Sequence, residues 1–207
     1  MSRVLPLVTV HNVCLFPNEE FGLEGVSFKI FTGKRYHLLS SDEDRQNGVL
    51  GLLEQRYSAH SGITRFKDHL TIQSDRLLMG DRLIDRRVEQ YLGLTSDLFY
   101  LNGKRCSKLF YINQLKAKSI LHLPVYKLRG KDKILFVLLA ALFQKSGLVL
   151  FSRFEKLNSD PDYSEFIKTL FQREEITIVL AEIGLDKRAP ENIQALTNEF
   201  EQIRIAN

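Results

Sequence analysis

The sequence contains few cysteines and no apolar run long enough to span a bilayer. Cys14 and Cys106 are its two cysteines, and neither has a Cys or His neighbour at zinc-ligand spacing. This argues against both a disulfide framework and a metal site. The longest apolar run, Ile134–Phe143, has ten residues, whereas a membrane helix needs about 20. We therefore expect a buried helix there and, because no secretory signal is visible, a protein that stays in the cytosol.

The sequence also lacks a large excess of charge of either sign. The 207 residues include 29 basic and 25 acidic side chains, a net charge of +4, which is a modest excess. A nucleic-acid site would rest on Lys104, Arg105 and Lys108 with Phe110 and Tyr111, or else on the basic run 127–133. Such charge runs are usually solvated faces, and no nucleic-acid-reading module accompanies them. No nucleic-acid partner is expected.

What the chain does contain is an ordinary globular composition with a clear order of elements. Its hydrophobic content of 44% supports one compact unit over residues 1–207. Alternating apolar residues predict strands over Leu7–Val13, Val26–Ile30 and Arg35–Leu39. The polar stretch Ser40–Asn47 then predicts a loop, followed by a short helix that begins near Val49. Strand, polar loop and helix are the layout of a phosphate-binding P-loop unit.

The second half of the chain predicts helices that alternate with buried strands. Apolar positions recur at helical spacing from about Asp81 to Pro124, with Gly93 and the turn-like Leu101-Asn102-Gly103 dividing the stretch, which favours an inserted helical layer. Helices are also predicted over Lys131–Gln144 and Tyr163–Gln172, and buried strands over Leu148–Phe151 and Ile176–Leu180. Two short closing segments are predicted within Ile193–Ile205. Together these elements predict an α/β fold with a parallel core sheet.

Several short motifs occur in a fixed order along the chain. They are Leu23–Ile30 with Gly33-Lys34, Ser61-Gly62-Ile63, Leu70–Gln73, Leu128–Asp132, Leu148–Phe151, Leu157–Asp160 and Thr177–Leu180. In this order they resemble the frame of ATP-binding-cassette (ABC) ATPases from about Val8 to Ile205. The resemblance implies an ABC ATPase-like fold with an antiparallel β subdomain, a mainly parallel P-loop-type core sheet and an inserted helical subdomain over about 81–127.

The residues that hydrolyse ATP in that family are missing from the matching positions. In the phosphate loop, Gln46 stands for the lysine and Asn47 for the Ser/Thr hydroxyl. The Walker B strand continues into Ser152-Arg153 without its aspartate and glutamate, and no switch histidine follows Ala181. The resemblance therefore implies a pseudo-ATPase with no catalytic residue, no metal ligand and no cofactor of its own, apart from ATP and Mg²⁺ at a site shared with a partner.

A subunit of this kind can still pair with an ABC ATPase, because in that family the signature loop of one subunit covers the phosphate loop of the other. We expect a hetero- or homodimer with an ABC ATPase, docked on an integral membrane permease at the cytoplasmic face of the inner membrane. Gln73 would serve as the Q-loop residue. The signature-like segment consists of Leu128, Arg129, Gly130, Lys131 and Asp132. Arg129 replaces the family serine and Lys131 the second glycine.

An alternative needs no nucleotide. In it the chain is a non-enzymatic adaptor or regulatory protein that binds a membrane protein through a groove between Gln73 and Tyr100, with Tyr91, Phe99 and Tyr100 as lining residues. Phe16 lies where ABC ATPases often place an aromatic residue that stacks on adenine. Without a phosphate site, we expect Phe16 to be a packing residue beside a turn.

Overall fold

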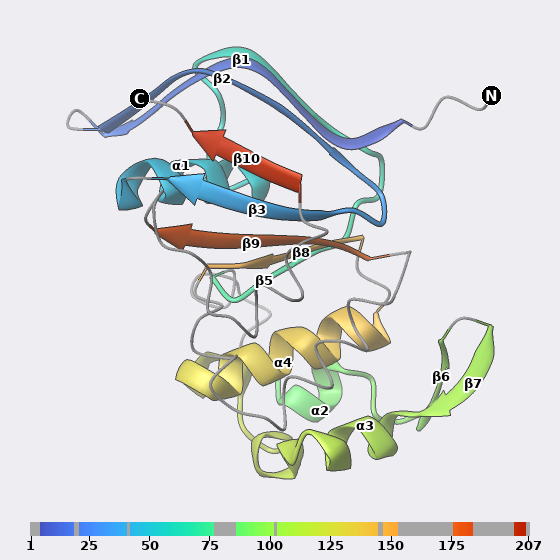
Figure 1. The fold of residues 1–207 in the computed structure, drawn as a ribbon. Helices are drawn as coiled ribbons and strands as arrows, with labels where there is room; N and C mark the ends of the chain where they lie inside the picture. The colour runs from blue at the N-terminus through green and yellow to red at the C-terminus, as the bar shows by residue number, and fades with distance from the viewer. Residues whose placement is uncertain are drawn as a thin grey trace.

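Three layers are stacked in the computed structural model, which describes residues 5–18, 21–40, 42–76, 86–101, 103–144, 147–152, 176–183 and 201–205. An antiparallel sheet lies at one end, a parallel sheet in the middle and a helical layer at the other end (Figure 1). The predicted α/β class, with an antiparallel sheet, a parallel core and an inserted helical layer, is confirmed.

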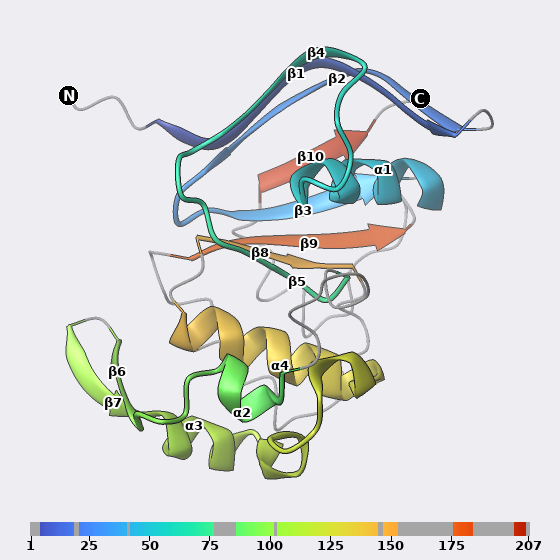
Figure 2. The same ribbon diagram turned by 180° about the vertical axis from the view of Figure 1, so that it is seen from behind.

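The antiparallel sheet has the strand order β2-β1-β4, with β1 at Pro6–Asn18, β2 at Phe21–Phe31 and β4 at Ser61–Phe66. Figure 2 shows β4 beside β1 from behind. Alternate residues of β1 are buried, including Val8 and Val10, as the alternation in the sequence predicts. Gly62 has a φ of +87°, and a Cβ there would lie 2.3 Å from the Asn12 carbonyl oxygen, so only glycine fits this position.

The middle sheet is parallel throughout, in the order β10-β3-β9-β8-β5. Its strands are β3 (Arg35–Ser40), β5 (Ile72–Ser74), β8 (Leu148–Phe151), β9 (Thr177–Ile183) and β10 (Glu201–Ile205). Leu148 and Leu150 face the antiparallel side, while Val149 and Phe151 face the helical side. Burial on both faces explains why β8 is uniformly apolar in the sequence.

Helix α1 spans Glu43–Leu53 and packs between the two sheets. The prediction of a polar loop through Asn47 is wrong, because residues 43–47 already belong to this helix. Asp42 is the helix N-cap, and Glu43 and Asp44 lie in the first turn. Carboxylates are favoured at both places by the helix dipole and its free N–H groups. Polar residues at a helix start thus look like a loop in the sequence.

The helical layer covers the other face of the parallel sheet. Its main element is α4 (Gly130–Phe143), accompanied by α2 (Val88–Tyr91), α3 (Lys108–Gln114) and the 3₁₀ turns η3 (Ala117–Ile120) and η4 (Val125–Lys127). A β-hairpin of β6 (Leu98–Leu101) and β7 (Lys104–Ser107) interrupts this layer. The prediction of helical segments is therefore wrong over 98–101 and 104–107. The strands are four residues long, too short for their period to be distinguished from a helical one.

Some predictions fall on residues outside the described ranges. These are the helix 163–172, the D-loop-like segment 157–160, residues 193–200 of the closing segments, and Arg153 after β8. The last predicted segment is present in part as β10. Within the described ranges, none of the helices is long and apolar enough to cross a membrane.

Candidate functional site

The carboxyl ends of parallel strands are where α/β sheets bind ligands. The ends of β3, β5 and β8 are therefore the candidate site in this fold. Ser40 ends β3, and its hydroxyl donates to the Asp42 carbonyl oxygen at 2.8 Å while accepting from the Asp42 N–H at 3.2 Å. Only residues 41 and 42 separate β3 from α1. The Ser40 hydroxyl thus bonds both backbone groups of Asp42 across this short connection.

The first N–H groups of α1 are bound by the chain's own carboxylate. Asp42 Oδ1 accepts hydrogen bonds from the backbone N–H groups of Asp44 at 2.7 Å and Arg45 at 3.4 Å. Free N–H groups at a helix N-terminus form a ready anion site. Here the anion is a side chain of the turn itself, with the carboxylates of Glu43 and Asp44 beside it in the sequence.

Gln46 and Asn47, the residues aligned with the phosphate-loop lysine and hydroxyl, lie inside α1. Gln46 is 2% exposed, and its Nε2 finds no hydrogen-bond partner within the part of the chain that the structure describes. Asn47 accepts through its Oδ1 from Arg76 Nη1 at 3.0 Å. The amide oxygen of Asn47 is therefore already hydrogen-bonded to the Arg76 guanidinium.

Arg76 belongs to a buried charge network, the Glu54 network, formed by Asn47, Glu54, Arg56, Ser74 and Arg76. The Glu54 side chain is fully buried; it accepts from Ser74 Oγ at 2.6 Å and from Arg56 Nε at 2.7 Å. Arg76 Nε lies 3.8 Å from Glu54 Oε1. Burial lowers the pKa of Arg76, an effect that the nearby Glu54 charge opposes. A fully buried carboxylate is tolerated because two cations and a hydroxyl compensate its lost hydration.

Asp75 and Ser152 form a polar pair that joins the ends of β5 and β8. The Ser152 N–H donates to Asp75 Oδ1 at 3.0 Å, and the Ser152 hydroxyl donates to Asp75 Oδ2 at 2.7 Å. Burial raises the pKa of Asp75, and the bonds from Ser152 and the charge of Arg76 oppose this rise. Ser152 is the position where the resemblance places the Walker B aspartate. Its hydroxyl is engaged with a carboxylate from the neighbouring strand.

Sequence reasoning did not single out Glu54, Asp75 or Arg76. The available signal was the run Gln73–Arg76, four consecutive polar residues that begin within β5 and continue past its carboxyl end. Among the described residues, no group of three or more His, Cys, Asp or Glu side chains is arranged to hold a metal ion.

Gln73 is buried in a chain of amide hydrogen bonds. Its Nε2 donates to Gln144 Oε1 at 3.0 Å, and Gln144 Nε2 donates to the Tyr91 carbonyl oxygen at 2.9 Å. These bonds tie β5 to the C-terminal end of α4 and to α2. Gln73, the predicted Q-loop residue, therefore connects the parallel sheet to the helical layer.

The aromatic residues proposed to line a groove occupy different environments. The Tyr91 ring packs edge-on against Phe136 with 4.9 Å between ring centroids. Phe99 is 7% exposed and packs against Tyr111 and Phe143. Tyr100 is 54% exposed on the β6–β7 hairpin. The structure does not bring the three side chains together on one surface, and their contact with a partner stays a prediction.

Phe16 packs locally in β1. Its ring lies edge-on to His60 with 5.6 Å between centroids, and its N–H donates to His60 Nδ1 at 3.3 Å. A Cβ on Gly22 would lie 2.6 Å from the Phe16 ring, so the ring rests on this glycine. The ring is 43% exposed. The choice between a packing role and adenine stacking for Phe16 stays a prediction.

The signature-like segment forms the start of α4. Leu128 is buried, whereas Arg129, Gly130 and Lys131 are exposed. The Arg129 guanidinium folds back and donates to the carbonyl oxygens of Tyr126 at 2.8 Å and Leu128 at 2.9 Å. Gly130 has a φ of +48°, and no atom lies within 4 Å of where its Cβ would be. Asp132, partly buried, follows in the first turn.

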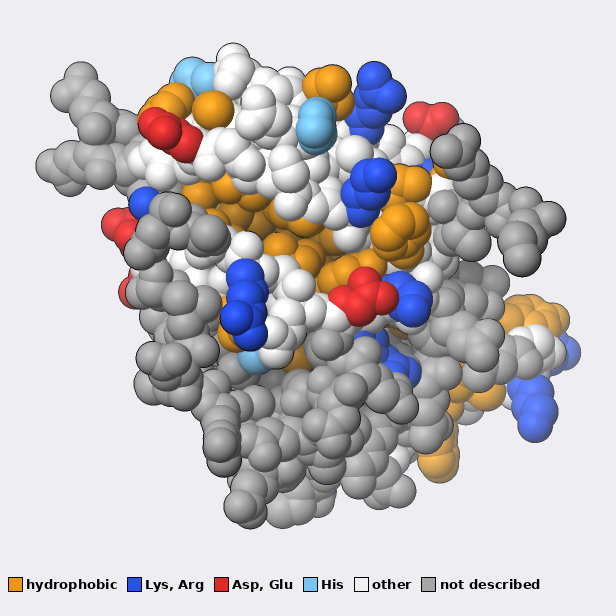
Figure 3. Space-filling view, turned by 45° about the horizontal axis from the view of Figure 1, so that its top comes forward, with side chains coloured by type: hydrophobic (Ala, Val, Ile, Leu, Met, Phe, Trp, Pro, Cys, Tyr) orange, Lys and Arg blue, Asp and Glu red, His pale blue; other side chains and the backbone are white. Residues whose placement is uncertain are grey.

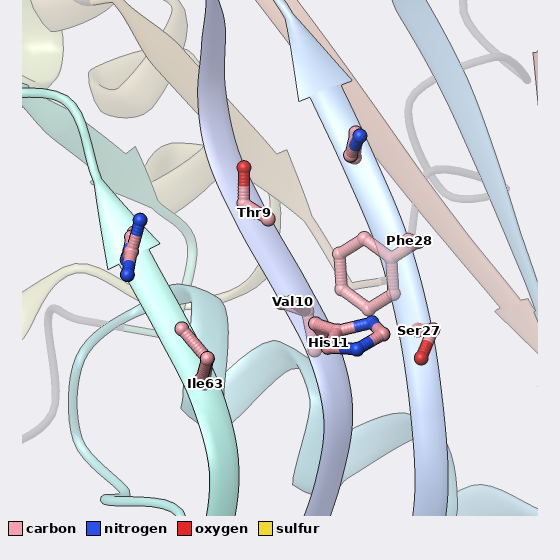
Figure 4. A pocket seen from close by; sticks show the side chains of 8 residues that line it. Thr9, Val10, His11, Ser27, Phe28 and Ile63 are labelled. Carbon is pink, nitrogen blue, oxygen red and sulfur yellow. The ribbon is translucent and has the colours of Figure 1, made fainter.

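A shallow hollow of about 550 Å³ lies on the antiparallel sheet, away from this edge. Side chains of all three strands line it, including His11 of β1, Phe28 of β2 and Ile63 of β4 (Figure 4). Lys29 and Arg65 flank Thr9 on the neighbouring strands. Both cations are exposed, and the hollow has no geometric connection to the carboxyl edge.

No family model and no curated protein matches this sequence. Solved structures do match. A metal-chelate-type ABC transporter in an inward-facing conformation is 14% identical with a TM-score of 0.62, over 97% of this chain and 80% of that one. A nucleotide-free ATP-binding cassette from an ABC transporter is 15% identical with a TM-score of 0.61, over 97% and 88%.

A third match is cbiO1 from Clostridium perfringens, part of the ABC transporter complex cbiONQ. It is 15% identical with a TM-score of 0.57, over 87% of this chain and 80% of that one. At such identities the similarity concerns the fold. The chain therefore has the ABC ATPase fold.

Proposed function

We propose that this chain is a catalytically inactive ABC ATPase-like subunit of a membrane transport complex, which pairs with an active ABC ATPase and docks on a permease subunit. The observation that carries the proposal is the Asp42 carboxylate on the first N–H groups of α1. In a working phosphate loop these groups bind the nucleotide. A nucleotide would have to displace a carboxylate that belongs to the helix cap.

Electrostatics at this turn supports the same conclusion. Asp42, Glu43 and Asp44 bring three carboxylates to the start of α1. One like-charge contact at about 4 Å costs about 4 kcal/mol at an effective dielectric constant near 20. The aligned lysine position holds the neutral Gln46, so no cation at that position offsets the repulsion.

The described residues at this edge do not fit Mg²⁺ either. Magnesium takes oxygen ligands, usually including a carboxylate, in a nearly octahedral arrangement. Asn47, aligned with the hydroxyl ligand, holds the Arg76 guanidinium, and Ser152, aligned with the Walker B aspartate, is bound to Asp75. A dication beside Arg76 would meet a like charge. We therefore derive no step of hydrolysis through this edge of the sheet.

The signature-like segment is the feature that suits pairing. Gly130 is exposed, lies at the start of the 14-residue α4 and has open space beside it. In this proposal the segment faces the nucleotide of an active ABC ATPase, which supplies the phosphate loop, the metal and the catalytic base. The complex would then lie at the cytoplasmic face of the membrane.

A matched pair of variants tests this role. Gly130 and Gly103 both have positive φ and no atom near the Cβ position, and asparagine tolerates such a conformation better than most residues. With the co-purified ABC ATPase, we expect Gly130→Asn to lower ATP hydrolysis by the complex and Gly103→Asn to leave it unchanged. Equal activity in both variants, or hydrolysis by this chain alone, would contradict the proposal.

A non-enzymatic adaptor that binds a membrane protein without any ABC ATPase is the second candidate. It is favoured by the Arg129 guanidinium, which donates to the carbonyl oxygens of its own loop. The two candidates differ in composition. Mass determination of the complex purified under native conditions shows an intact ABC ATPase in the first case and only a membrane protein in the second.

A further inference from the structure

Exposed apolar side chains are concentrated on one part of the helical layer. Eight large apolar residues are exposed within the described ranges, and five of them lie between residues 98 and 126. Four of the five belong to the β6–β7 hairpin and the first turn of α3, and we call them the hairpin patch: Leu98 (45% exposed), Tyr100 (54%), Leu109 (48%) and Phe110 (61%). Burying such side chains in an apolar phase is favourable.

The hairpin patch is held in place by the fold. Asp97 accepts hydrogen bonds from the backbone N–H groups of Lys108 and Leu109, at 2.6 and 2.8 Å, and from the Ser107 hydroxyl at 3.1 Å. These bonds fix the base of the hairpin to the first turn of α3. Phe99, which points the opposite way from its strand neighbours, anchors β6 in the core. The exposed side chains are thus presented from a fixed element.

Basic residues predominate in the sequence of the hairpin and the segment after it, although the Asp97 carboxylate lies at the base of the hairpin. Residues 98–131 contain no Asp or Glu. The same stretch contains eight basic residues: Lys104, Arg105, Lys108, Lys116, Lys118, Lys127, Arg129 and Lys131. Tyr100 is paired with Arg105 across the hairpin. Lys108 differs from the others because its ammonium group is turned inward onto the carbonyl oxygens of Leu92 and Gly93.

The hairpin projects sideways from the helical layer, beyond one end of α4 (Figure 1). Hydrophobic and basic side chains lie next to one another on the projecting element at the right edge of Figure 3. A projecting element with apolar side chains at its surface and cations around it has the chemistry of a membrane-contact element.

We propose that the hairpin patch inserts into the headgroup region of a bilayer that contains anionic lipids, with Lys104 and Arg105 binding the lipid phosphates. Each basic residue near an anionic membrane surface contributes attraction, and Leu, Phe and Tyr side chains suit the boundary between headgroups and acyl chains. Contact with lipid is independent of the pairing proposed above, because it needs neither nucleotide nor a protein partner.

A single-stranded nucleic acid also combines phosphates with apolar surfaces, yet it suits this patch less well. Nucleic-acid platforms use aromatic faces on which bases stack. Leu98 and Leu109 offer no such face, and the Phe110 ring is packed edge-on against Tyr111 at an interplanar angle of 90°. The aliphatic half of the patch therefore gains free energy from insertion into lipid and little from stacked bases.

The test is co-sedimentation of the full chain with vesicles of phosphatidylcholine alone and with about one-third phosphatidylglycerol. We expect binding to the anionic vesicles that weakens as salt is added. The variant Leu109→Ser/Phe110→Ser should lower the partition coefficient by about tenfold or more, because two apolar side chains lose their insertion. The variant Lys104→Glu/Arg105→Glu should bind only weakly.

A charge-matched control separates a local contact from net charge. Lys29→Glu/Arg65→Glu changes the net charge by the same amount on the exposed face of the antiparallel sheet, and it should retain binding. The changed residues are surface residues, and thermal melting checks that each variant is folded. The proposal is overturned if anionic vesicles do not bind the wild-type chain, if the control loses binding equally, or if a single-stranded oligonucleotide binds and vesicles do not compete for it.

Discussion

Gln46 is a polar side chain in an apolar setting. It is 2% exposed between the two sheets, and its amide nitrogen has no hydrogen-bond partner among the described residues. A buried donor without a partner costs its full desolvation free energy, about 1–3 kcal/mol. Methionine has nearly the same shape and no donor to desolvate.

We expect Gln46→Met to raise the free energy of unfolding by about 1 kcal/mol, measured by urea denaturation. Gln73→Met is the matched control. Its amide donates to Gln144, so the same substitution there should lower the free energy of unfolding by about 1–2 kcal/mol. If Gln46→Met is the more destabilising of the two, the amide of Gln46 has a partner in the folded protein.

Asp75 makes stability depend on pH. Because burial raises its pKa above the ordinary value, the folded state binds a proton more readily than the unfolded state does. The free energy of unfolding therefore falls as the pH rises from about 4, the ordinary carboxyl pKa, through the raised value. The contribution is fully present only at lower pH.

Two variants at this pair should shift that dependence in opposite directions. Asp75→Asn removes the charge, so its stability relative to the wild type should improve as the pH rises from about 4 to 7. Ser152→Ala removes a hydrogen bond that opposes the rise in pKa, so the decline should become steeper. Urea denaturation across this pH range measures both. Parallel curves for all three proteins would show that Asp75 titrates normally.

Residue identities in the candidate site could be predicted only in part. The sequence shows that Gln46, Asn47 and Ser152 replace a lysine, a hydroxyl residue and an aspartate. It does not show that Gln73 is buried, because its partner Gln144 is 71 residues away. Contacts of this kind are created by the fold, and no local pattern encodes them.

At the scale of elements, α1 depends on its cap. Asp42 binds two N–H groups of the first turn, and replacing an N-cap aspartate by alanine costs about 1 kcal/mol. We expect Asp42→Ala to lower the free energy of unfolding by that amount and Asp42→Ser, which keeps a capping oxygen, to lower it less. Chemical denaturation measures both. Equal losses would show that the carboxylate acts through its charge and not as a cap.

The elements themselves were predictable where a pattern extends over enough residues. The long strands β1 and β2 alternate clearly, and α4 and β8 are strongly apolar. The start of α1 was missed because acidic residues suit both loops and first helical turns. The strands β6 and β7 were predicted as helix because each is only four residues long, and because Phe99 of β6 and Cys106 of β7 pack into the helical layer.

At the scale of the whole molecule, the ABC ATPase fold is present although sequence identity to matching structures is only 14–15%. The frame of apolar strands and helices maintains the fold, whereas phosphate binding and hydrolysis depend on a few polar positions. A fold alone does not determine function. We propose that these positions serve internal contacts in this chain, as Asn47 does with Arg76 and Ser152 with Asp75.

The most direct test of this claim is a calorimetric titration of the purified chain with ATP, with and without Mg²⁺. We predict no saturable binding, that is, a Kd above about 1 mM, which corresponds to less than about 4 kcal/mol of binding free energy. Micromolar binding that requires Mg²⁺ would contradict the account. It would show that the Asp42 turn opens and that the Glu54 network and the Asp75–Ser152 pair rearrange to admit a nucleotide.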